Sequence, residues 1–260
     1  MDLAQAIEDN TAELLMAMGA AGGGSQRDDA SARWTIGGSP LDYHNAVVAA
    51  GGDLEQVVAE SAEELRRYGV PGTWHVGPSF RSAELTDHLI AAGFAPDGSE
   101  PGMAVRLDEL RAPAAVPGLE LERVTDDAGL AIWEQTLGRG FGEGEKEAHW
   151  VASVYRTLGY TDPWRHYVAT RNGSPVGTIT IYLTASVAGV YFVMTVPEAR
   201  RQGIGAALTH KALTQATTQY AVLTSSSAGQ SVYTSLGFQT HSHIDLYTLD
   251  PRSPTVTESL

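Results

Sequence analysis

Apolar residues recur along this chain with two different spacings, and these spacings predict helices alternating with strands. In residues 53–68, Leu54, Val57, Val58 and Leu65 fall on one side of a helix. Short apolar runs bounded by glycine, proline or polar residues are typical of buried strands. We expect helices at about residues 4–18, 53–68, 82–92, 128–137, 145–158 and 228–235, and another that begins near residue 203. We expect strands at about residues 72–76, 103–107, 119–124, 166–170, 175–184, 190–196, 220–225 and 243–248, and a loop over residues 19–31.

The order of these elements predicts a mixed α/β sheet, because helices interleave with the strands and part of the strand order reads as an antiparallel meander. One connector divides the chain. Residues 111–118 read Arg-Ala-Pro-Ala-Ala-Val-Pro-Gly, and a stretch rich in proline and alanine is typical of a linker. We therefore expect a first domain over residues 1–112, a linker over residues 113–118 and a second domain over residues 119–260.

The chain is strongly acidic, with 17 lysines and arginines against 31 aspartates and glutamates and a formal net charge of -14. Such a surface repels nucleic acid and anionic lipid, so we expect neither a nucleic-acid nor a membrane partner. It favours a small amine-bearing or cationic molecule. The absence of cysteine excludes disulfides, thiol nucleophiles and cysteine metal sites. The first nine residues do not resemble a leader peptide, and no apolar run approaches membrane-spanning length, so we expect a cytoplasmic protein.

The most informative stretch is residues 190–208, which reads as an apolar strand, a sharp turn and a helix with a glycine-rich first turn. Gly203 and Gly205 carry no Cβ, so the backbone there can approach a ligand closely. The unpaired N–H groups of a helix N-terminus, with the positive end of its dipole, form an anion site, most naturally for phosphate. The pattern completes neither of the two common phosphate-loop motifs, and a helix start with incidental glycines is the alternative interpretation.

Two segments resemble motifs of the GNAT superfamily of acyl-CoA-dependent N-acyltransferases. Residues 200–205, Arg-Arg-Gln-Gly-Ile-Gly, are similar to motif A, Arg/Gln-x-x-Gly-x-Gly/Ala, and follow the usual apolar strand. Residues 233–238, Tyr-Thr-Ser-Leu-Gly-Phe, are similar to the closing Tyr-x-x-Leu-Gly-Phe segment. The resemblance covers about residues 117–250. It implies the GNAT fold and an acyl-CoA, most naturally acetyl-CoA, as co-substrate, with no metal.

The resemblance also implies roles for individual residues. In the superfamily the motif A strand separates from its neighbour, and its main-chain groups bind the pantetheine arm and can polarise the thioester carbonyl. The pyrophosphate lies on amides at the start of the next helix. Ser226 stands where many members have an asparagine that contacts the cofactor arm. The expected cofactor-binding residues are Met194, Thr195, Val196, Arg201, Gln202, Gly203, Ile204, Gly205, Ala206 and Ser226.

Tyr233 takes the position of the superfamily tyrosine that protonates the departing sulfur. A phenol with a pKa near 10 is protonated at neutral pH and suited to donate a proton. The alternative is a helix tyrosine that packs on Phe238. The general base is left unassigned, because the usual strand glutamate is absent from residues 190–193 and a water relay is also possible. Candidates are Glu143, Glu145, Glu147 and His149, each equally explained as part of a solvated acidic helix start.

Other residues admit two interpretations. Trp133, Trp150 and Trp164 fall in the region expected to line the acceptor site, where they could stack on a substrate or lie in the core. His241 and His243 would share one face of a strand, but no third ligand is apparent. We therefore interpret these histidines as surface residues and expect no metal site.

A weak internal repeat links the two halves of the chain. Residues 89–94, Leu-Ile-Ala-Ala-Gly-Phe, followed by an apolar strand, parallel residues 233–238 and the strand after them. When Gly93 is aligned with Gly237, Leu89 takes the position of Tyr233. The first half has no counterpart of residues 200–205. We therefore expect two tandem GNAT-like lobes, of which the N-terminal one is a degenerate copy. The alternative is that helix-Gly-Phe is a common way to end a helix.

Together these observations predict an N-acetyltransferase that moves an acetyl group from acetyl-CoA to an amine of a small molecule or peptide. Two other classes remain open: a sensor that binds acyl-CoA without transferring the group, and an enzyme of the same fold that acts on another acyl thioester. The sequence does not indicate the acceptor, the acyl length or the oligomeric state, because one scaffold serves many acceptors.

Overall fold

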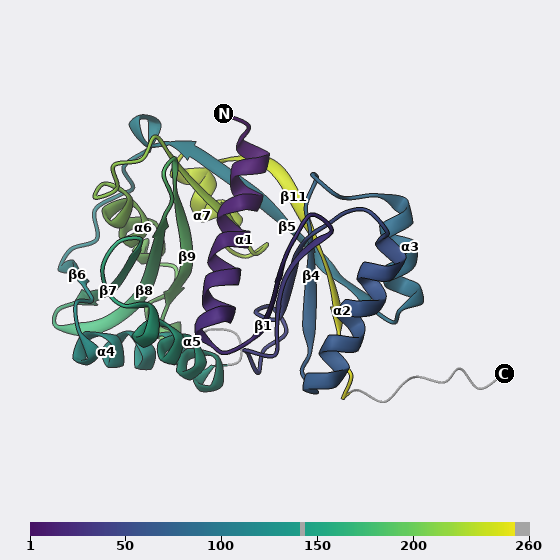
Figure 1. Cartoon of the computed structure of the whole chain (residues 1–260). Helices are drawn as coiled ribbons and strands as arrows, with labels where there is room; N and C mark the ends of the chain where they lie inside the picture. Colours follow the sequence, from purple (N-terminus) through teal and green to yellow (C-terminus); the bar gives the residue numbers. More distant parts are fainter. Residues whose placement is uncertain (141–143, 253–260) are drawn as a thin grey trace. The chain divides into compact units, whose positions relative to one another are not determined.

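The structure is a computed structural model that describes residues 1–140 and 144–252 (Figure 1). Contacts between Cα atoms divide the chain into two compact units, each built from more than one segment. Unit 1 contains Met1–Leu14 and Glu100–His243, and unit 2 contains Leu15–Ser99 and the segment that begins at Ile244. The two domains expected at residues 1–112 and 119–260, with a linker between them, are inferred from sequence composition and not from contacts. That division of the chain stays a prediction.

Unit 2 combines a small sheet with two helices. Its strands lie in the order β1-β2-β3-β4-β11; β3 and β4 are parallel and the other neighbours are antiparallel. The apolar faces of both helices pack on this sheet around Trp74 and Phe94, whose ring centroids are 6.3 Å apart. Its elements are β1 (Ser25–Asp28), β2 (Ala32–Ile36), β3 (Ala46–Ala50), α2 (Leu54–Tyr68), β4 (Gly72–Val76), α3 (Ala83–Ala91), the first part of β5 (Ala95–Arg106) and the last part of β11 (Gln239–Leu249).

Helix α2 forms where the apolar spacing predicts it. Asp53 caps its N-terminus, because its carboxylate accepts a hydrogen bond from the Gln56 N–H at 3.0 Å. Gly69 ends the helix with a φ of 64°, a left-handed conformation that glycine adopts without a Cβ clash. The predicted apolar face, including Val57 and Leu65, is buried. Local signals therefore determine this element almost completely.

Three strands of unit 2 are missing from the sequence prediction. Residues 19–31, expected as a loop, contain β1, and β2 and β3 follow it. β1 reads Ser-Gln-Arg-Asp, so no apolar alternation marks it. It pairs with β2 in register from Ser25↔Ile36 to Asp28↔Arg33. Its strand conformation therefore comes from main-chain pairing with the next strand, β2, in a hairpin, and not from its own side chains.

Unit 1 is a mixed sheet with helices on both faces, which confirms the predicted fold class. Its strands lie in the order β11-β5-β10-β9-β8-β7-β6. β9 and β10 are parallel, while β5–β10 and the successive pairs from β6 to β9 are antiparallel. Its elements after β5 are β6 (Leu119–Arg123), α4 (Asp127–Gly138), α5 (Glu145–Leu158), β7 (Trp164–Arg171), β8 (Ser174–Leu183), β9 (Val187–Thr195), α6 (Ile204–Leu213), β10 (Tyr220–Thr224), α7 (Gln230–Ser235) and short 3-10 turns at Leu107–Glu109 and Pro197–Ala199.

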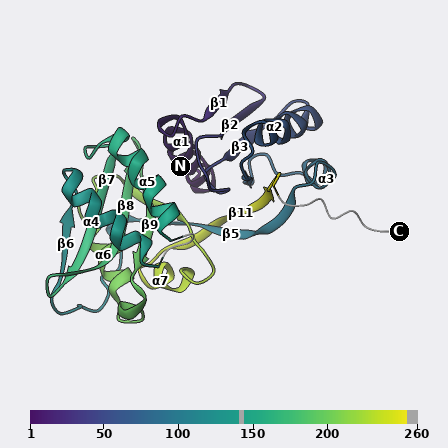
Figure 2. The same cartoon turned by 90° about the horizontal axis from the view of Figure 1, so that it is seen from below.

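Helices α5 and α6 lie on opposite faces of this sheet. A Cβ added to Gly177 on β8 would lie 2.9 Å from Leu208 of α6, so this face of the strand meets α6. Thr180, three residues later, points to the other face, where its hydroxyl lies 3.0 Å from His166 Nδ1. Tyr155 of α5 stacks on His166 with ring centroids 3.9 Å apart. Figures 1 and 2 show α4 beside α5.

The first part of α1 (Leu3–Ala21) packs on unit 1. Ile7 is fully buried against residues of β5, β9 and β10, among them Val187 and Val222. A Cβ added to Gly189 of β9 would lie 1.8 Å from Asn10 Oδ1, so a larger residue there would push the helix away. Like the other described helices, α1 does not combine the length and the apolar character needed to cross a membrane.

The two segments of the internal repeat share one local structure. The Phe94 N–H donates to the Leu89 carbonyl at 3.0 Å, and the Phe238 N–H donates to the Tyr233 carbonyl at 3.1 Å. The glycines that precede the phenylalanines have φ values of 94° and 99°. This arrangement ends many helices. The idea that the N-terminal half is a degenerate copy of the C-terminal half therefore stays a prediction.

Candidate functional site

Strand β9 separates from its parallel neighbour after a short pairing. In the described residues β9 and β10 pair only over Val187–Gly189 and Tyr220–Val222. Along β8 the pairing of β9 continues, with a bulge where Ile179 faces both Phe192 and Val193. Phe192 has a φ of 51°, which is rare for a bulky residue. Beyond the short pairing, the edge of β9 toward β10 therefore offers main-chain groups without a strand partner.

The strand register decides which of these groups are available. The Val196 N–H donates to the Val176 carbonyl at 3.0 Å, and the Val196 carbonyl accepts from the Ala199 N–H at 2.9 Å. Bonded residues alternate along an antiparallel pair, so Met194 also directs its main chain toward β8, and Thr195 directs its main chain away. The expected unpaired main-chain donor at Val196 is therefore wrong. Of the three expected residues, Thr195 faces the open edge.

The turn into α6 depends on two residues with left-handed backbone. Arg201 has a φ of 59°, and Gly203, which precedes the helix, has a φ of 77°. Within the described part of the chain no side chain caps this helix, so its first N–H groups remain available to an anion. A Cβ at Gly205 would lie 3.7 Å from Thr195 Oγ1, an ordinary contact. The fold itself therefore tolerates a side chain at Gly205, and the missing Cβ keeps space open.

A cavity of about 530 Å³ opens in front of this turn, between the start of α6 and one face of α7. It is lined by Thr195, Ala199, Arg200, Arg201, Gly203, Ile204, Gly205, Ala206, Ala228, Ser231, Val232 and Ser235. Most of the predicted cofactor-binding residues are thus brought together. Met194 and Val196 are buried and do not line it, and Gln202 and Ser226 do not line it either.

Gln202 and Ser226 bond within the chain instead. The Gln202 amide donates to the Glu198 carbonyl at 3.2 Å and accepts from Arg171 at 2.5 Å. The exposed Ser226 hydroxyl accepts from the Gly229 N–H at 3.3 Å, which stabilises the turn before α7. Nothing in the structure tests a ligand contact by either residue, so their cofactor roles stay predictions.

Several cavity residues were not expected from the sequence. Ala228, Ser231, Val232 and Ser235 form its α7 wall, and their spacing of three to four residues is a helical signal that could have found them. Arg200 was seen only as part of a motif. Its Nε donates to the Thr195 carbonyl at 3.0 Å and its Nη2 to the Gly140 carbonyl at 2.7 Å. This guanidinium brings a positive charge to the cavity.

Tyr233 lies on α7 and is half-buried. Its ring packs edge-on against Phe238 at a centroid distance of 5.8 Å, as the packing interpretation expects. Burial raises the pKa of the Tyr233 phenol, so it is protonated at neutral pH. Its hydroxyl makes no hydrogen bond with the residues that the structure describes. Packing alone therefore leaves the hydroxyl unexplained, and its role as a proton donor stays a prediction.

The tryptophans expected near the acceptor site have different environments. Trp133 and Trp164 are buried in an aromatic cluster with Tyr155 and His166, which supports the core interpretation. Trp150 is only half-buried on α5. Burial lowers the pKa of His166 to about 3, so this ring is neutral. This buried cluster forms the support under the bulge of β9.

The candidate bases and metal ligands are mostly on the surface. His149 is exposed, and its Nδ1 lies 3.0 Å from Glu134. Glu145 is exposed and Glu147 is half-buried, while Glu143 lies outside the described residues. No base is assigned by this geometry. His241 and His243 are exposed on β11, and within residues 1–140 and 144–252 no group of three His, Asp or Glu is placed to hold a metal.

Comparisons with known proteins agree with this architecture. Residues 162–240 match the family model described as acetyltransferase (GNAT) domain. A GCN5-related N-acetyltransferase from Kribbella flavida is 17% identical with a TM-score of 0.66, over 94% of this chain and 96% of that one. A conserved protein of unknown function from Staphylococcus epidermidis is 14% identical with a TM-score of 0.69, over 87% of this chain and 94% of that one.

A tandem GNAT protein from the clavulanic acid biosynthesis pathway is 15% identical with a TM-score of 0.58, over 86% of this chain and 79% of that one. A comparison with curated proteins finds no match. The family model and the fold of these structures agree on the GNAT class. Residues 162–240 of this chain match a GNAT acetyltransferase domain, which confirms the resemblance seen in the sequence.

Proposed function

We propose that this protein transfers an acetyl group from acetyl-CoA to an amine of a small molecule or peptide. The observation that carries the proposal is the cavity at the start of α6, where free amide donors, two arginines and missing side chains meet. The family match spans the same segment. When bound, acetyl-CoA supplies a thioester that is already activated for attack by an amine.

The residues of this cavity suit a phosphate-bearing ligand. The first-turn amides of α6 and the positive end of its dipole attract an anion. Arg200 and Arg201 add positive charge, and the hydroxyl of Ser231 can donate a hydrogen bond from the opposite wall. A diphosphate would therefore find donors on both sides. The main-chain N–H of Thr195, which faces the open edge, extends this donor set toward the bulge of β9.

Two residues are proposed for the chemistry near this site. Tyr233 would hold a proton at its hydroxyl and deliver it to the departing thiolate, because burial keeps the phenol protonated at neutral pH. Thr195 would direct its main-chain N–H toward the open edge of β9, where an oxyanion can be stabilised. The base that removes the proton of the amine stays unassigned.

The acceptor is proposed to be a small amine and not a nucleic acid. The formal net charge of -14 attracts cations and repels phosphate backbones. An amine is mostly protonated at neutral pH, so it approaches this surface as a cation. Charge alone does not separate a metabolite from a peptide N-terminus.

Calorimetric titration with acetyl-CoA, followed by a mass-spectrometric screen of amines, tests the proposal. We expect saturable binding of acetyl-CoA and an acetylated product from at least one amine. Absence of heat with both acetyl-CoA and CoA would contradict the assignment of the cavity. Binding without any product would favour an acyl-CoA sensor, and consumption of the thioester without amine acetylation would favour another thioester reaction.

A further inference from the structure

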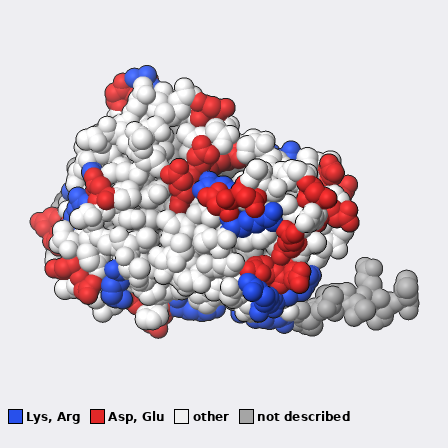
Figure 3. All heavy atoms as spheres, in the orientation of Figure 1, with Lys and Arg blue, Asp and Glu red and all other residues white. Residues whose placement is uncertain are grey.

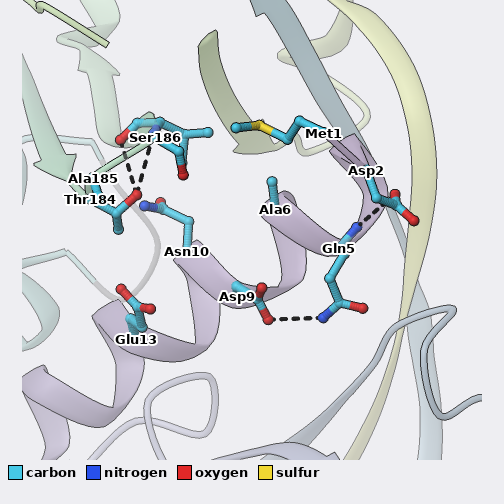
Figure 4. Close-up of a pocket in the computed structure, with 11 residues that line it drawn as sticks. Met1, Asp2, Gln5, Ala6, Asp9, Asn10, Glu13, Thr184, Ala185 and Ser186 are labelled. Carbon is cyan, nitrogen blue, oxygen red and sulfur yellow. Dashed lines mark hydrogen bonds between the residues drawn. The ribbon is translucent and has the colours of Figure 1, made fainter. Parts of the chain in front are cut away.

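A second cavity, of about 460 Å³, lies between α1 and the turn that joins β8 to β9 (Figure 4). We call it the α1 cleft. All its lining residues belong to unit 1. It is lined by Met1, Asp2, Gln5, Ala6, Asp9, Asn10, Glu13, Thr184, Ala185, Ser186 and Val187. It shares no residue with the cavity at α6.

One wall of the α1 cleft is acidic. Asp9 and Glu13 are one helical turn apart, so their carboxylates lie on the same side of α1, and Asp2 starts the same stripe. Among the described lining residues no side chain is a Lys, Arg or His. Figure 3, in the orientation of Figure 1, shows acidic side chains along α1. An acidic helix face alone would be explained as a solvated surface.

The charge of Glu13 acts on the strands beneath it. Glu13 makes no hydrogen bond or ion pair with the part of the chain that the structure describes. Burial raises the pKa of the phenol of Tyr182, and the negative charge of Glu13 adds to this effect. Burial and the same charge also raise the pKa of Tyr191. The Glu13 carboxylate therefore has no ion-pair partner among the described residues, and its charge acts on two tyrosines of β8 and β9.

Asn10 supplies an independent sign of a ligand. Its side chain is 1% exposed, and its Oδ1 accepts from the Tyr191 hydroxyl at 2.6 Å. Its Nδ2 is buried and has no hydrogen-bond partner among the described residues. Figure 4 shows this amide extending from α1 toward the Thr184–Ser186 turn across the cleft. A buried N–H without an acceptor is unfavourable, so the site is incomplete without an acceptor atom.

We propose that the α1 cleft binds a small organic diamine that also carries a hydroxyl or carbonyl oxygen. Its ammonium groups pair with Asp9 and Glu13, and its oxygen accepts a hydrogen bond from Asn10 Nδ2. A purely cationic molecule satisfies only the carboxylates, and a neutral polyol satisfies only the amide. The biological role of this ligand rests on the proposed function, since such a molecule has the chemistry of an acyl acceptor.

Three small molecules separate these requirements: 1,3-diaminopropan-2-ol has both features, 1,3-diaminopropane lacks the oxygen, and glycerol lacks the charge. Binding is followed by NMR of the full chain, in which the side-chain amides of asparagine are labelled with ¹⁵N. The chain has only Asn10, Asn45 and Asn172, so these signals are few. Titrations use low salt, because screening weakens exposed ion pairs.

We expect 1,3-diaminopropan-2-ol to shift the Asn10 amide signals and to bind about fivefold more tightly than 1,3-diaminopropane, as one additional hydrogen bond predicts. Glycerol should not shift them. Glu13→Gln should weaken binding about threefold, whereas Glu63→Gln, which removes an exposed charge from α2, should not. Comparing ligands in this way leaves the buried Asn10 intact, so the test does not depend on a variant that fails to fold.

The proposal is overturned if the Asn10 signals do not move, if both diamines bind equally, or if Glu63→Gln weakens binding as much as Glu13→Gln. All titrations are made without coenzyme A. The α1 cleft can therefore fail this test while acetyl-CoA still binds at α6, and it can pass the test even if the protein binds no coenzyme A.

Discussion

Tyr191 on β9 donates a hydrogen bond to Asn10 Oδ1 on α1 at 2.6 Å, although the two residues lie 181 positions apart in the chain. The hydroxyl of Thr11 lies 3.5 Å from the same phenol oxygen. Tyr191 directly precedes Phe192 in the bulge of β9. This contact attaches the first turns of α1 to the strand that carries the candidate site. Residues far from any motif thus belong to the same compact unit as the segment that matches the GNAT family model.

Replacing Tyr191 with phenylalanine should destabilise the protein. The change removes the donor to the buried Asn10 oxygen and leaves the amide without either partner. We expect a loss of about 1–3 kcal/mol in the free energy of unfolding, measured by denaturant titration. Tyr182→Phe is the matched control, because no hydrogen bond of its hydroxyl to a described residue is lost; it should change stability by less than about 0.5 kcal/mol. Equal effects in the two variants would contradict the role of this contact.

Side chains at Gly205 should separate coenzyme binding from folding. A Cβ there makes only an ordinary contact with Thr195, and alanine is a better helix former than glycine, so Gly205→Ala should keep or raise the melting temperature. The larger Gly205→Val fills the space in front of the α6 amides. We expect it to weaken acetyl-CoA binding at least about tenfold by calorimetry, a loss of about 1.4 kcal/mol. Unchanged affinity in a folded Gly205→Val protein would remove the phosphate assignment.

Replacing Tyr233 with phenylalanine keeps the ring that packs on Phe238 and removes only the hydroxyl. Because this hydroxyl has no partner within the described residues, stability should change by less than about 0.5 kcal/mol. If it protonates the leaving group, the turnover rate should fall by about 10²- to 10⁴-fold while acetyl-CoA affinity stays the same. Steady-state kinetics and calorimetry measure the two quantities. An unchanged turnover rate would contradict the role of Tyr233 as proton donor and would favour the packing interpretation.

Stability should fall as the pH drops below the normal range of histidine. Burial lowers the pKa of His166 to about 3 and that of His75 to about 4. In the unfolded chain both rings take up protons near their ordinary pKa of 6.5, so acid favours the unfolded state. His166→Gln should therefore reduce the slope of the unfolding free energy by about 1.4 kcal/mol per pH unit between about pH 6 and pH 4.

Denaturant unfolding at several pH values measures this slope. His241→Gln, which changes an exposed histidine, serves as the control and should leave the slope as it is in the unchanged protein. An identical slope for His166→Gln would mean that the buried ring is protonated in the folded state, contrary to its environment.

The sequence predicted those parts of the candidate site whose conformation depends on the local backbone. Gly203 lies in the predicted sharp turn before α6, and most of the motif residues do line one cavity. The prediction failed at Val196, whose main-chain groups are used by Val176 and Ala199. The apolar pattern marks the strand, but only its pairing with β8 determines which edge each N–H faces.

The sequence by itself determined the elements with local signals: α2 between its Asp53 cap and Gly69, the glycine turn into α6, and the GNAT resemblance that rests on it. Tertiary structure decided what depends on distant partners. It buried Trp133 and brought Asn10 to Tyr191. The physical reason is that caps and φ preferences act within a few residues, whereas strand pairing and burial require contacts between segments that the chain order does not specify.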